Sequence, residues 1–119
     1  AELESRDTGK PIREALAGDI PRTIAYFRIF ADYITSYGSE CFPMDGLAVN
    51  YVLREPLGVA GLITPWNTPF MLESWKLAPA IATGNSVVLK PAEQTPLSAL
   101  AVAVLAERVV ADLMTEDVA

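Results

Sequence analysis

Two short apolar segments, with one helix-length segment between them, constrain the fold of this chain most strongly. Residues 58–64 (GVAGLIT) and residues 86–90 (SVVLK) are almost uniformly apolar, which is typical of strands covered on both faces of a parallel sheet. Residues 69–83 lie between them and are expected to be helical, with Pro79 as a bend and Gly84 at the end. A strand, a helix and a second strand in this order predict a βαβ unit and a parallel α/β sheet.

The flanking segments add two helices and one more strand. A helix is expected over residues 19–38, with Asp19 as its N-cap. Residues 47–54 alternate apolar and polar side chains, as a half-exposed strand does. Thr95 and Pro96 are expected to cap a last helix. The predicted fold class is α/β, with a partial βαβα unit preceded by a helix and a peripheral strand.

The helix expected at residues 19–38 carries two stripes of large side chains. One stripe is predicted to face the core. The other is aromatic and is interpreted as packing surface, because aromatic side chains at helical spacing are usually buried. The core stripe is Ile20, Ile24, Phe27, Ala31 and Ile34, and the aromatic stripe is Tyr26, Phe30, Tyr33 and Tyr37.

Charge and hydropathy argue against two classes of partner. With Lys+Arg 9, no histidine and a net charge of -6, the chain lacks the basic excess that phosphate binding requires, so no nucleic-acid partner is expected. The longest nearly apolar stretch, residues 97–106, is about half of the roughly twenty residues that a membrane span needs, so no membrane partner is expected.

The single cysteine, Cys41, lies in an expected loop and is interpreted as structural, and its isolation favours a cytoplasmic location.

Polar residues follow both strands of the predicted parallel pair. Residues 64–67 come after the first strand and residues 90–93 after the second. Because ligands bind beyond the carboxyl ends of parallel strands, this edge is the predicted site. The sequence contains no G-x-G-x-x-G, no P-loop and no metal-ligand cluster, so no metal is expected. The pattern locates a site without naming its ligand.

One face of the helix at residues 69–83 borders this edge. Thr68, Leu72 and Trp75 are spaced at i, i+4 and i+7 and share that face, with Lys76 beside it. On spacing alone, core packing for Trp75 and a solvated charge for Lys76 are favoured, because apolar helix faces usually pack.

Residues 54–100 closely resemble the NAD(P)-dependent aldehyde dehydrogenase superfamily. The resemblance rests on PWN at residues 65–67 and KPAEQTP at residues 90–96, a combination that is highly specific. The segments DTGKP, at residues 7–11, and FRIFADY, at residues 27–33, fit the parts of the family pattern that come before.

The resemblance implies a Rossmann-like parallel sheet that binds its cofactor without the usual glycine fingerprint. It places one group of residues beside the nicotinamide and pyrophosphate, and it identifies Lys90 and Glu93 as the pair that holds the adenosine ribose. A carboxylate that accepts both ribose hydroxyls repels a 2′-phosphate, so Glu93 favours NAD, although members with this glutamate also accept NADP. The implied cofactor-binding residues are Ile63, Thr64, Pro65, Trp66, Lys90, Ala92 and Glu93.

The resemblance also implies a catalytic role for Asn67. It matches the oxyanion-hole asparagine, whose amide donates to the aldehyde oxygen as a cysteine thiolate attacks. Lys76 corresponds to a lysine near the site that is associated with proton handling. Glu73, on the same helix, is expected to lie on the surface, and tuning of the substrate's charge preference is the alternative. The implied substrate-tunnel residues are Thr68, Leu72 and Trp75.

The family pattern implies a division of the chain into three parts. Residues 1–46 form an N-terminal helical segment, residues 47–57 are part of an oligomerisation arm, and residues 58–119 are a partial NAD-binding domain, so a homo-oligomer is expected. The first ten residues are interpreted as a cut end. After about residue 107 the sequence is expected to depart from the family pattern.

The implied reaction is the oxidation of an aldehyde to a carboxylate with NAD. The family's nucleophilic cysteine and general-base glutamate are expected outside this sequence, and Cys41 does not correspond to the nucleophile, so the isolated chain is predicted to be inactive. The FRIFADY and PWNTPFM segments lean toward semialdehyde substrates. Two alternatives stay open: a non-catalytic truncated or pseudogene product that acts as an interaction module, and a relative that reduces acyl groups.

Overall fold

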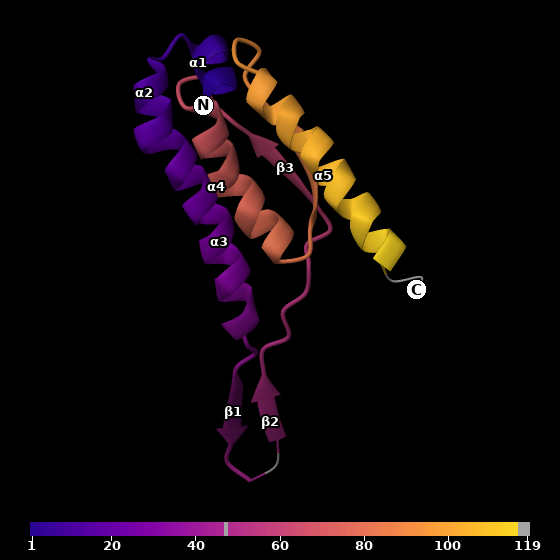
Figure 1. Cartoon of the computed structure of the whole chain (residues 1–119). Coiled ribbons are helices and arrows are strands. Elements are labelled where there is room, and N and C mark those ends of the chain that lie inside the picture. Colours follow the sequence, from indigo (N-terminus) through magenta and orange to yellow (C-terminus); the bar gives the residue numbers. More distant parts are fainter. Residues whose placement is uncertain (47, 117–119) are drawn as a thin grey trace.

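Helices lie beside a parallel pair of strands, and a two-stranded hairpin extends away from them (Figure 1). The structure is a computed structural model that describes residues 1–46 and 48–116, with side chains described as far as residue 112. The elements in chain order are α1 (Glu2–Thr8), α2 (Ile12–Glu14), the π-helical turn η1 (Ala15–Asp19), α3 (Ile20–Ser36), β1 (Cys41–Met44), β2 (Ala48–Tyr51), β3 (Val59–Ile63), α4 (Pro69–Ala82), β4 (Ser86–Lys90) and α5 (Leu97–Glu116).

The predicted βαβ unit is confirmed. β3 and β4 pair in parallel, in a register that joins the starts of both strands and places Ile63 opposite Lys90. α4 connects them and begins with Pro69, whose fixed φ suits the first helical position. Gly84, with a φ of 80°, lets the chain turn back toward β4. The α/β fold class is therefore confirmed.

The parallel strands are covered on one face only. Side chains alternate between half-buried and exposed along both strands, and Val59, Ile63 and Val88 are 69%, 67% and 64% exposed. The prediction that these strands are covered on both faces is wrong for the described residues, because α4 is the main described helix that packs against them. One apolar face of the pair is open in this part of the chain.

The first long helical region begins earlier than predicted. α2, η1 and α3 follow one another without a break. Asp19 is not an N-cap, because its backbone is helical, with φ -68° and ψ -46°, and its side chain forms an ion pair with Lys10. The helical region starts after Pro11 instead.

α3 packs along α4 (Figure 1). The half-buried side chains include Tyr26, Phe27, Phe30 and Ile34, whereas the exposed ones include Ile24, Ala31, Tyr33 and Tyr37. Both predicted stripes are thus partly wrong, and the packing face of α3 lies between them. Periodicity identified a helix, but the side that faces α4 is set by tertiary packing.

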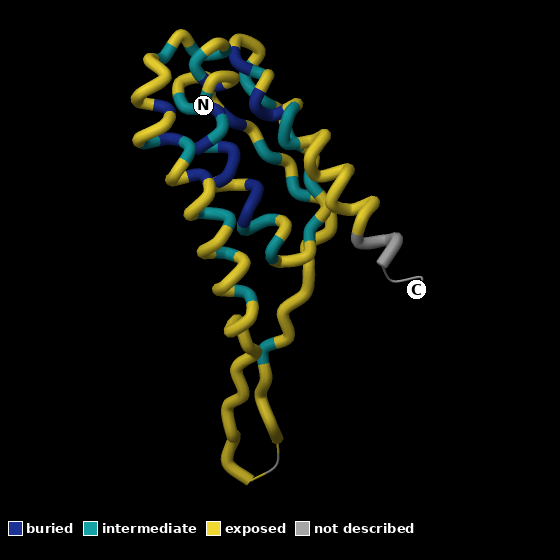
Figure 2. The backbone as a smooth tube through the Cα atoms, in the orientation of Figure 1, coloured by how far each residue is buried: buried dark blue, intermediate teal, exposed yellow. Residues whose placement is uncertain are grey.

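β1 and β2 form an antiparallel hairpin that projects from the helices and is exposed throughout (Figure 1, Figure 2). Cys41 pairs with Tyr51, and Pro43 pairs with Val49. The sequence predicted a single strand at residues 47–54 and a loop around Cys41, and the loop is wrong because β1 lies there. Pro43 concealed this strand, since proline has no N–H for the ladder and is confined to edge strands.

Buried residues gather where the first half of α4 meets α1 and the start of α3 (Figure 2). Carboxyl groups are among these buried residues, and Glu4 and Glu73 are each 1% exposed. The prediction that Glu73 lies on the surface is wrong, since the part of α1 that carries Glu4 lies close to it. The buried apolar side chains are Ala15, Met71, Leu77, Ala78 and Ala99.

α5 confirms the predicted last helix and contacts both α1 and α4. It begins at Leu97, directly after the predicted capping pair. Among the helices of residues 1–46 and 48–116, none is both long enough and apolar enough to cross a membrane.

Candidate active site

The carboxyl ends of β3 and β4 lie next to each other. Ile63 pairs with Lys90, and the backbone N–H of Thr64 donates to the carbonyl of Lys90 at 3.1 Å. The segments that follow are residues 64–68, here called the β3 loop, and residues 91–96, the β4 loop. The two polar segments predicted from the sequence therefore start from one edge of the sheet.

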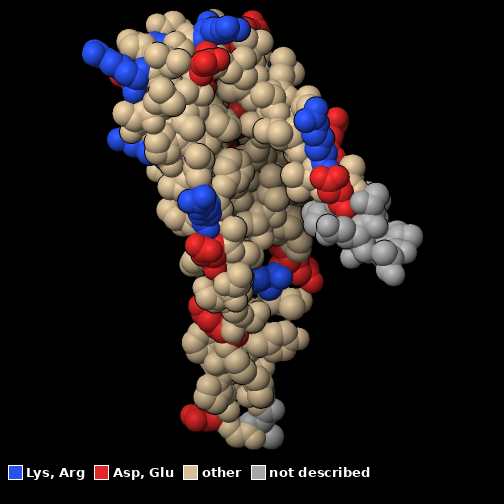
Figure 3. Space-filling model, in the orientation of Figure 1, with Lys and Arg blue, Asp and Glu red and all other residues tan. Residues whose placement is uncertain are grey.

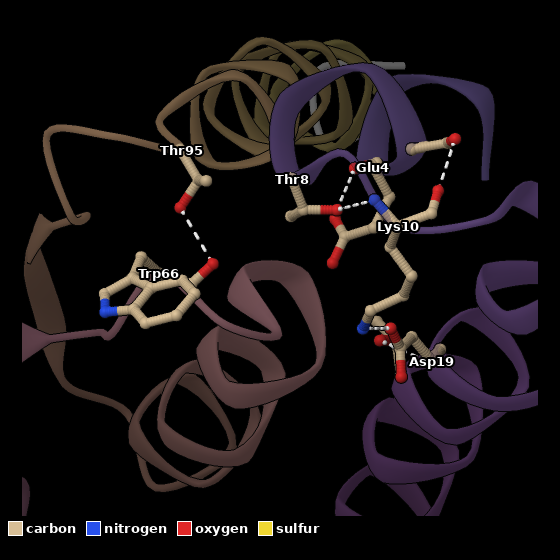
Figure 4. Close-up of polar contacts among 8 residues, drawn as sticks. Glu4, Thr8, Lys10, Asp19, Trp66 and Thr95 are labelled. Atoms are coloured by element: carbon tan, nitrogen blue, oxygen red, sulfur yellow. Dashed lines mark hydrogen bonds and ion pairs between the residues drawn. The ribbon is translucent and has the colours of Figure 1, made fainter.

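A hydrogen bond joins the two loops. The hydroxyl of Thr95 donates to the backbone carbonyl of Trp66 at 3.3 Å (Figure 4), and Thr95 itself is buried. The bonded carbonyl belongs to the residue immediately before Asn67. Thr95 thus helps to fix the backbone from which Asn67 projects. Sequence reasoning missed this role because it assigned Thr95 to the cap of the last helix.

α5 is capped from a distant part of the chain. The N–H of Leu97 donates to Oδ2 of Asp7 at 2.8 Å. The prediction that Thr95 caps this helix is wrong, because its hydroxyl is bonded to Trp66 instead. An acidic side chain from α1 supplies an acceptor that the helix N-terminus lacks locally.

Asn67 is exposed on the turn between β3 and α4. Pro65 and Pro69 stand on either side of it and restrict the backbone of this turn. The N–H of Leu72 donates to the carbonyl of Thr68 at 3.0 Å and closes the first turn of α4. Within the described residues no hydrogen bond holds the Asn67 amide, so its N–H groups are free to donate to a ligand.

The predicted substrate face of α4 lies beside α3. Thr68 and Leu72 are half-buried, and Trp75 is partly exposed. The ring of Trp75 packs edge-on against Tyr26 of α3, with centroids 5.3 Å apart and an interplanar angle of 66°. Tyr26 therefore borders this face of α4. The position of Tyr26 in the sequence did not indicate that contact.

Lys76 is exposed but is not merely a solvated charge. Its Nζ donates to the carbonyl of Ile63 at the end of β3. The contact ties α4 to the strand end that precedes the β3 loop. The residues that the family resemblance implies for cofactor binding occupy both loops and the last residues of both strands. Thr64 is buried and Ala92 is half-buried. The exposed ones are Ile63, Pro65, Trp66, Lys90 and Glu93.

Two buried carboxyl groups lie near the start of α4. Burial raises the pKa of Glu73 to about 7, and the negative charge of Glu4 adds to the shift. Burial also raises the pKa of Glu4, although the backbone N–H of Phe70 acts in the opposite direction. Both carboxyl oxygens of Glu4 and Oε1 of Glu73 have no hydrogen-bond partner among the described residues. Glu73 therefore changes its charge near neutral pH.

The candidate site is an open edge and not a closed cavity. A cavity of about 610 Å³ lies at the other end of α4 and contains none of the candidate site residues. On the face shown in Figure 3, the hollow between α4 and α5 is lined mainly by uncharged side chains. The 610 Å³ cavity at the other end of α4 is lined in part by Ile34, Tyr37, Arg54, Pro56 and Gly84.

The fold and this edge define a Rossmann-like α/β protein with two polar loops at the carboxyl ends of its parallel strands. The model described as "Aldehyde dehydrogenase family" matches residues 1–113. This chain belongs to the aldehyde dehydrogenase family. The match continues beyond residue 107, so the predicted departure from the family pattern at that point is wrong as far as residue 113.

Relatives and solved structures agree with this assignment. An aldehyde dehydrogenase from Rhodospirillum rubrum is 53% identical over 114 residues, which are 96% of this chain and 22% of that protein. PnpE from a Pseudomonas species, solved in complex with nicotinamide adenine dinucleotide, is 47% identical with a TM-score of 0.82, over 86% of this chain and 21% of that one. A betaine aldehyde dehydrogenase from Staphylococcus aureus, solved with NAD+, is 41% identical with a TM-score of 0.85, over 91% of this chain and 22% of that one. The chain thus spans about a fifth of the length of the proteins it matches.

Proposed function

We propose that this chain carries the oxyanion-hole asparagine and part of the cofactor site of an NAD-dependent aldehyde dehydrogenase. One observation carries the proposal: the Thr95–Trp66 hydrogen bond fixes the turn, and the Asn67 amide is free on its exposed side. A preorganised N–H donor at a developing oxyanion stabilises it by about 3 kcal/mol. An aldehyde oxygen needs such a donor when a nucleophile adds to its carbonyl carbon.

The residues at this edge of the sheet suit an NAD(P) cofactor, and we propose NAD as the form that binds. Ile63 and Trp66 are large exposed side chains close to Asn67, so a flat ring system has an apolar surface to cover. Glu93 is an exposed carboxylate on the β4 loop, and Lys90 ends β4 at the same edge. A carboxylate in this place accepts ribose hydroxyls and repels a 2′-phosphate, which favours NAD over NADP.

In the proposed reaction an aldehyde, water and NAD give a carboxylate and NADH. NAD, when bound, accepts the hydride. Asn67 donates to the carbonyl oxygen when a cysteine thiolate adds to the aldehyde, and again when water cleaves the thioester. Lys76 holds the end of β3 through the Ile63 carbonyl, and its role in proton handling is part of the proposal. The aldehyde is proposed to approach along Thr68, Leu72 and Trp75.

The nucleophile and the general base have no counterpart in residues 1–119. Cys41 lies on the hairpin, well away from the candidate site (Figure 1), and Glu73 is buried. We expect this chain alone to produce no NADH from an aldehyde.

The β2 strand of the hairpin is proposed to belong to the arm through which the complete enzyme forms a homo-oligomer. An exposed strand edge offers unpaired backbone groups to another chain. The proposed parts are a helical segment at residues 1–46, the arm at residues 47–57 and a partial NAD-binding domain at residues 58–119, and the first boundary falls between the two strands of the hairpin. The exposed large side chains of the hairpin are Phe42, Met44, Val49 and Tyr51.

A second candidate function is a non-catalytic interaction module. The comparisons do not favour it, because the matched relatives are aldehyde dehydrogenases and the chain spans about a fifth of their length. The observation behind it is the open apolar face of the parallel pair, where Val59, Ile63 and Val88 are exposed, because large exposed apolar faces mark association sites. A semialdehyde substrate and acyl-reducing activity rest on the family resemblance alone.

Calorimetric titration of the purified chain with NAD and NADP separates the two candidates. We expect NAD to bind more tightly than NADP, and Glu93→Gln to reduce that preference because it removes the charge that opposes a 2′-phosphate. Glu107→Gln, on the exposed side of α5, is the matched control and should leave both affinities unchanged. Failure of NAD to bind a chain that circular dichroism shows to be folded would favour the interaction module.

A further inference from the structure

α1 sends two acidic side chains toward the two helices that follow the parallel strands. Oδ2 of Asp7 accepts the N–H of Leu97, the first residue of α5, at 2.8 Å. Glu4 lies three residues earlier on the same side of α1. Its carboxyl group lies close enough to the N–H of Phe70, the second residue of α4, for that N–H to lower its pKa, although neither oxygen completes a hydrogen bond.

Neither helix has a side-chain cap from its own loop. Thr68 precedes α4 but makes no side-chain cap bond. Thr95, just before α5, gives its hydroxyl to the Trp66 carbonyl. The first N–H groups of a helix need acceptors from outside it, and acidic side chains also match the positive end of the helix dipole. Asp7 supplies such an acceptor to α5, and Glu4 places its carboxyl group near the start of α4 without completing a hydrogen bond.

α1 is itself held firmly to the rest of the fold. Gly9, with a φ of 74°, ends α1 in the left-handed region. The Ser5 hydroxyl then donates to the Lys10 carbonyl at 2.6 Å, and the Lys10 ammonium pairs with Asp19 of η1 (Figure 4). The DTGKP segment thereby fixes the orientation from which Glu4 and Asp7 reach α4 and α5.

We infer that Glu4 and Asp7 are positioning residues, through which α1 holds the β3 loop and the β4 loop in the geometry that the site requires. α4 begins two residues after Asn67, and α5 begins directly after the β4 loop, which contains Glu93. A shift of either helix end moves one loop relative to the other and strains the Thr95–Trp66 bond between them. What the loops bind rests on the proposed function, whereas the positioning rests on the contacts themselves.

Three variants of α1 test this inference in the full chain. Asp7→Ala removes the acceptor for Leu97, Asp7→Asn keeps a good N-cap while it removes the charge, and Glu2→Ala removes an exposed acid from the same helix as a control. Residue-resolved amide hydrogen exchange is measured at Leu97. We expect exchange there to be about fivefold faster in Asp7→Ala, which corresponds to the usual value of about 1 kcal/mol for an N-cap, and within about twofold of wild type in the other two variants.

Trp66 reports on the loops directly. In a Trp75→Phe background it is the only tryptophan, so acrylamide quenching measures its exposure in each variant. We expect quenching to rise in Asp7→Ala and in Glu4→Gln, at temperatures where circular dichroism shows every variant folded, and to stay unchanged in Asp7→Asn and Glu2→Ala. A purely structural role would lower the melting temperature without changing Trp66 in the folded state.

The outcomes separate this inference from the proposed function. Unchanged Leu97 exchange and Trp66 quenching in Asp7→Ala would overturn the inference, as would an equal effect of Glu2→Ala. If these readouts change as expected but wild type does not bind NAD, the positioning stands and the proposed function fails. If wild type binds NAD and Asp7→Ala binds it about fivefold more weakly, with rescue by Asp7→Asn, both stand.

Discussion

Glu4 and Glu73 bring two carboxyl groups, each 1% exposed, within electrostatic reach of one another at the meeting of α1 and α4. Such a pair resists carrying two negative charges, because burial disfavours each charge and each charge disfavours the other. Glu73 belongs to α4, the helix that carries the candidate substrate face, and Glu4 of α1 lies close to the start of that helix. The protonation of Glu73 is therefore coupled to the stability of that helix.

Replacing Glu73 with Gln should stabilise the fold above neutral pH. The pKa of Glu73 is 4.5 in the unfolded chain and about 7 in the folded chain. Its contribution to stability is therefore fully present below pH 4.5 and is lost as the pH rises through about 7. Glu73→Gln keeps the shape without the charge and escapes that loss, which is on the order of 3 kcal/mol at about pH 8 for a shift of this size. Urea unfolding at about pH 5 and about pH 8 measures the difference.

The matched control is Glu107→Gln on the exposed side of α5, which should have the same small effect at both pH values. Glu4→Gln should lower the pKa of Glu73, because it removes the neighbouring negative charge. Asp19 and Lys10 act on Glu4 with opposite signs and are unchanged in these variants. A stability difference between wild type and Glu73→Gln that is equal at both pH values would contradict the coupling.

Removing the hydroxyl of Thr95 should loosen the link between the loops. Thr95→Val leaves the Trp66 carbonyl without its partner and should lower the free energy of unfolding by about 1–2 kcal/mol. Thr95→Ser keeps the donor and should retain most of that stability. Denaturant unfolding of both variants measures the effect, and equal losses in the two would assign Thr95 to packing instead of hydrogen bonding.

The Lys10–Asp19 ion pair should matter more than the exposed pair between Arg54 and Glu40. Its side chains are only 17% and 9% exposed, so Asp19→Asn leaves a largely buried ammonium unpaired and should destabilise the fold by about 3 kcal/mol. Glu40→Gln breaks the exposed pair, where the charges are 3.6 Å apart, and should change stability by less than about 1 kcal/mol. Thermal unfolding measures the stability of the two variants. Similar losses of stability would contradict the expectation that the buried pair contributes more than the exposed one.

Local patterns predicted the parts of the fold that local chemistry sets. The bounds of β4, the start of α4 at Pro69 and the turn at Gly84 follow from hydrophobic runs and from the backbone preferences of proline and glycine. The shared edge of the two loops follows from parallel pairing. β1 was missed because Pro43 made it look unlike a strand.

The remaining features depend on contacts between distant parts of the chain. The Asp7–Leu97 bond joins residues that are 90 positions apart, and no local pattern indicates which acid will reach that helix. The burial of Glu73 was missed for the same reason, since a glutamate with no visible partner is expected at the surface. The proposed roles of Asn67 and Glu93 came from the family resemblance, because spacing alone located an edge without naming its ligand.

The most direct test of the proposed function is the kcat of the complete enzyme with Asn67→Ala, measured as aldehyde-dependent NADH formation. We expect kcat to fall by roughly 10²–10³, because one donor to the developing oxyanion is lost, while the affinity for NAD stays unchanged. A kcat within about twofold of wild type would contradict the proposal that the Asn67 amide stabilises the transition state.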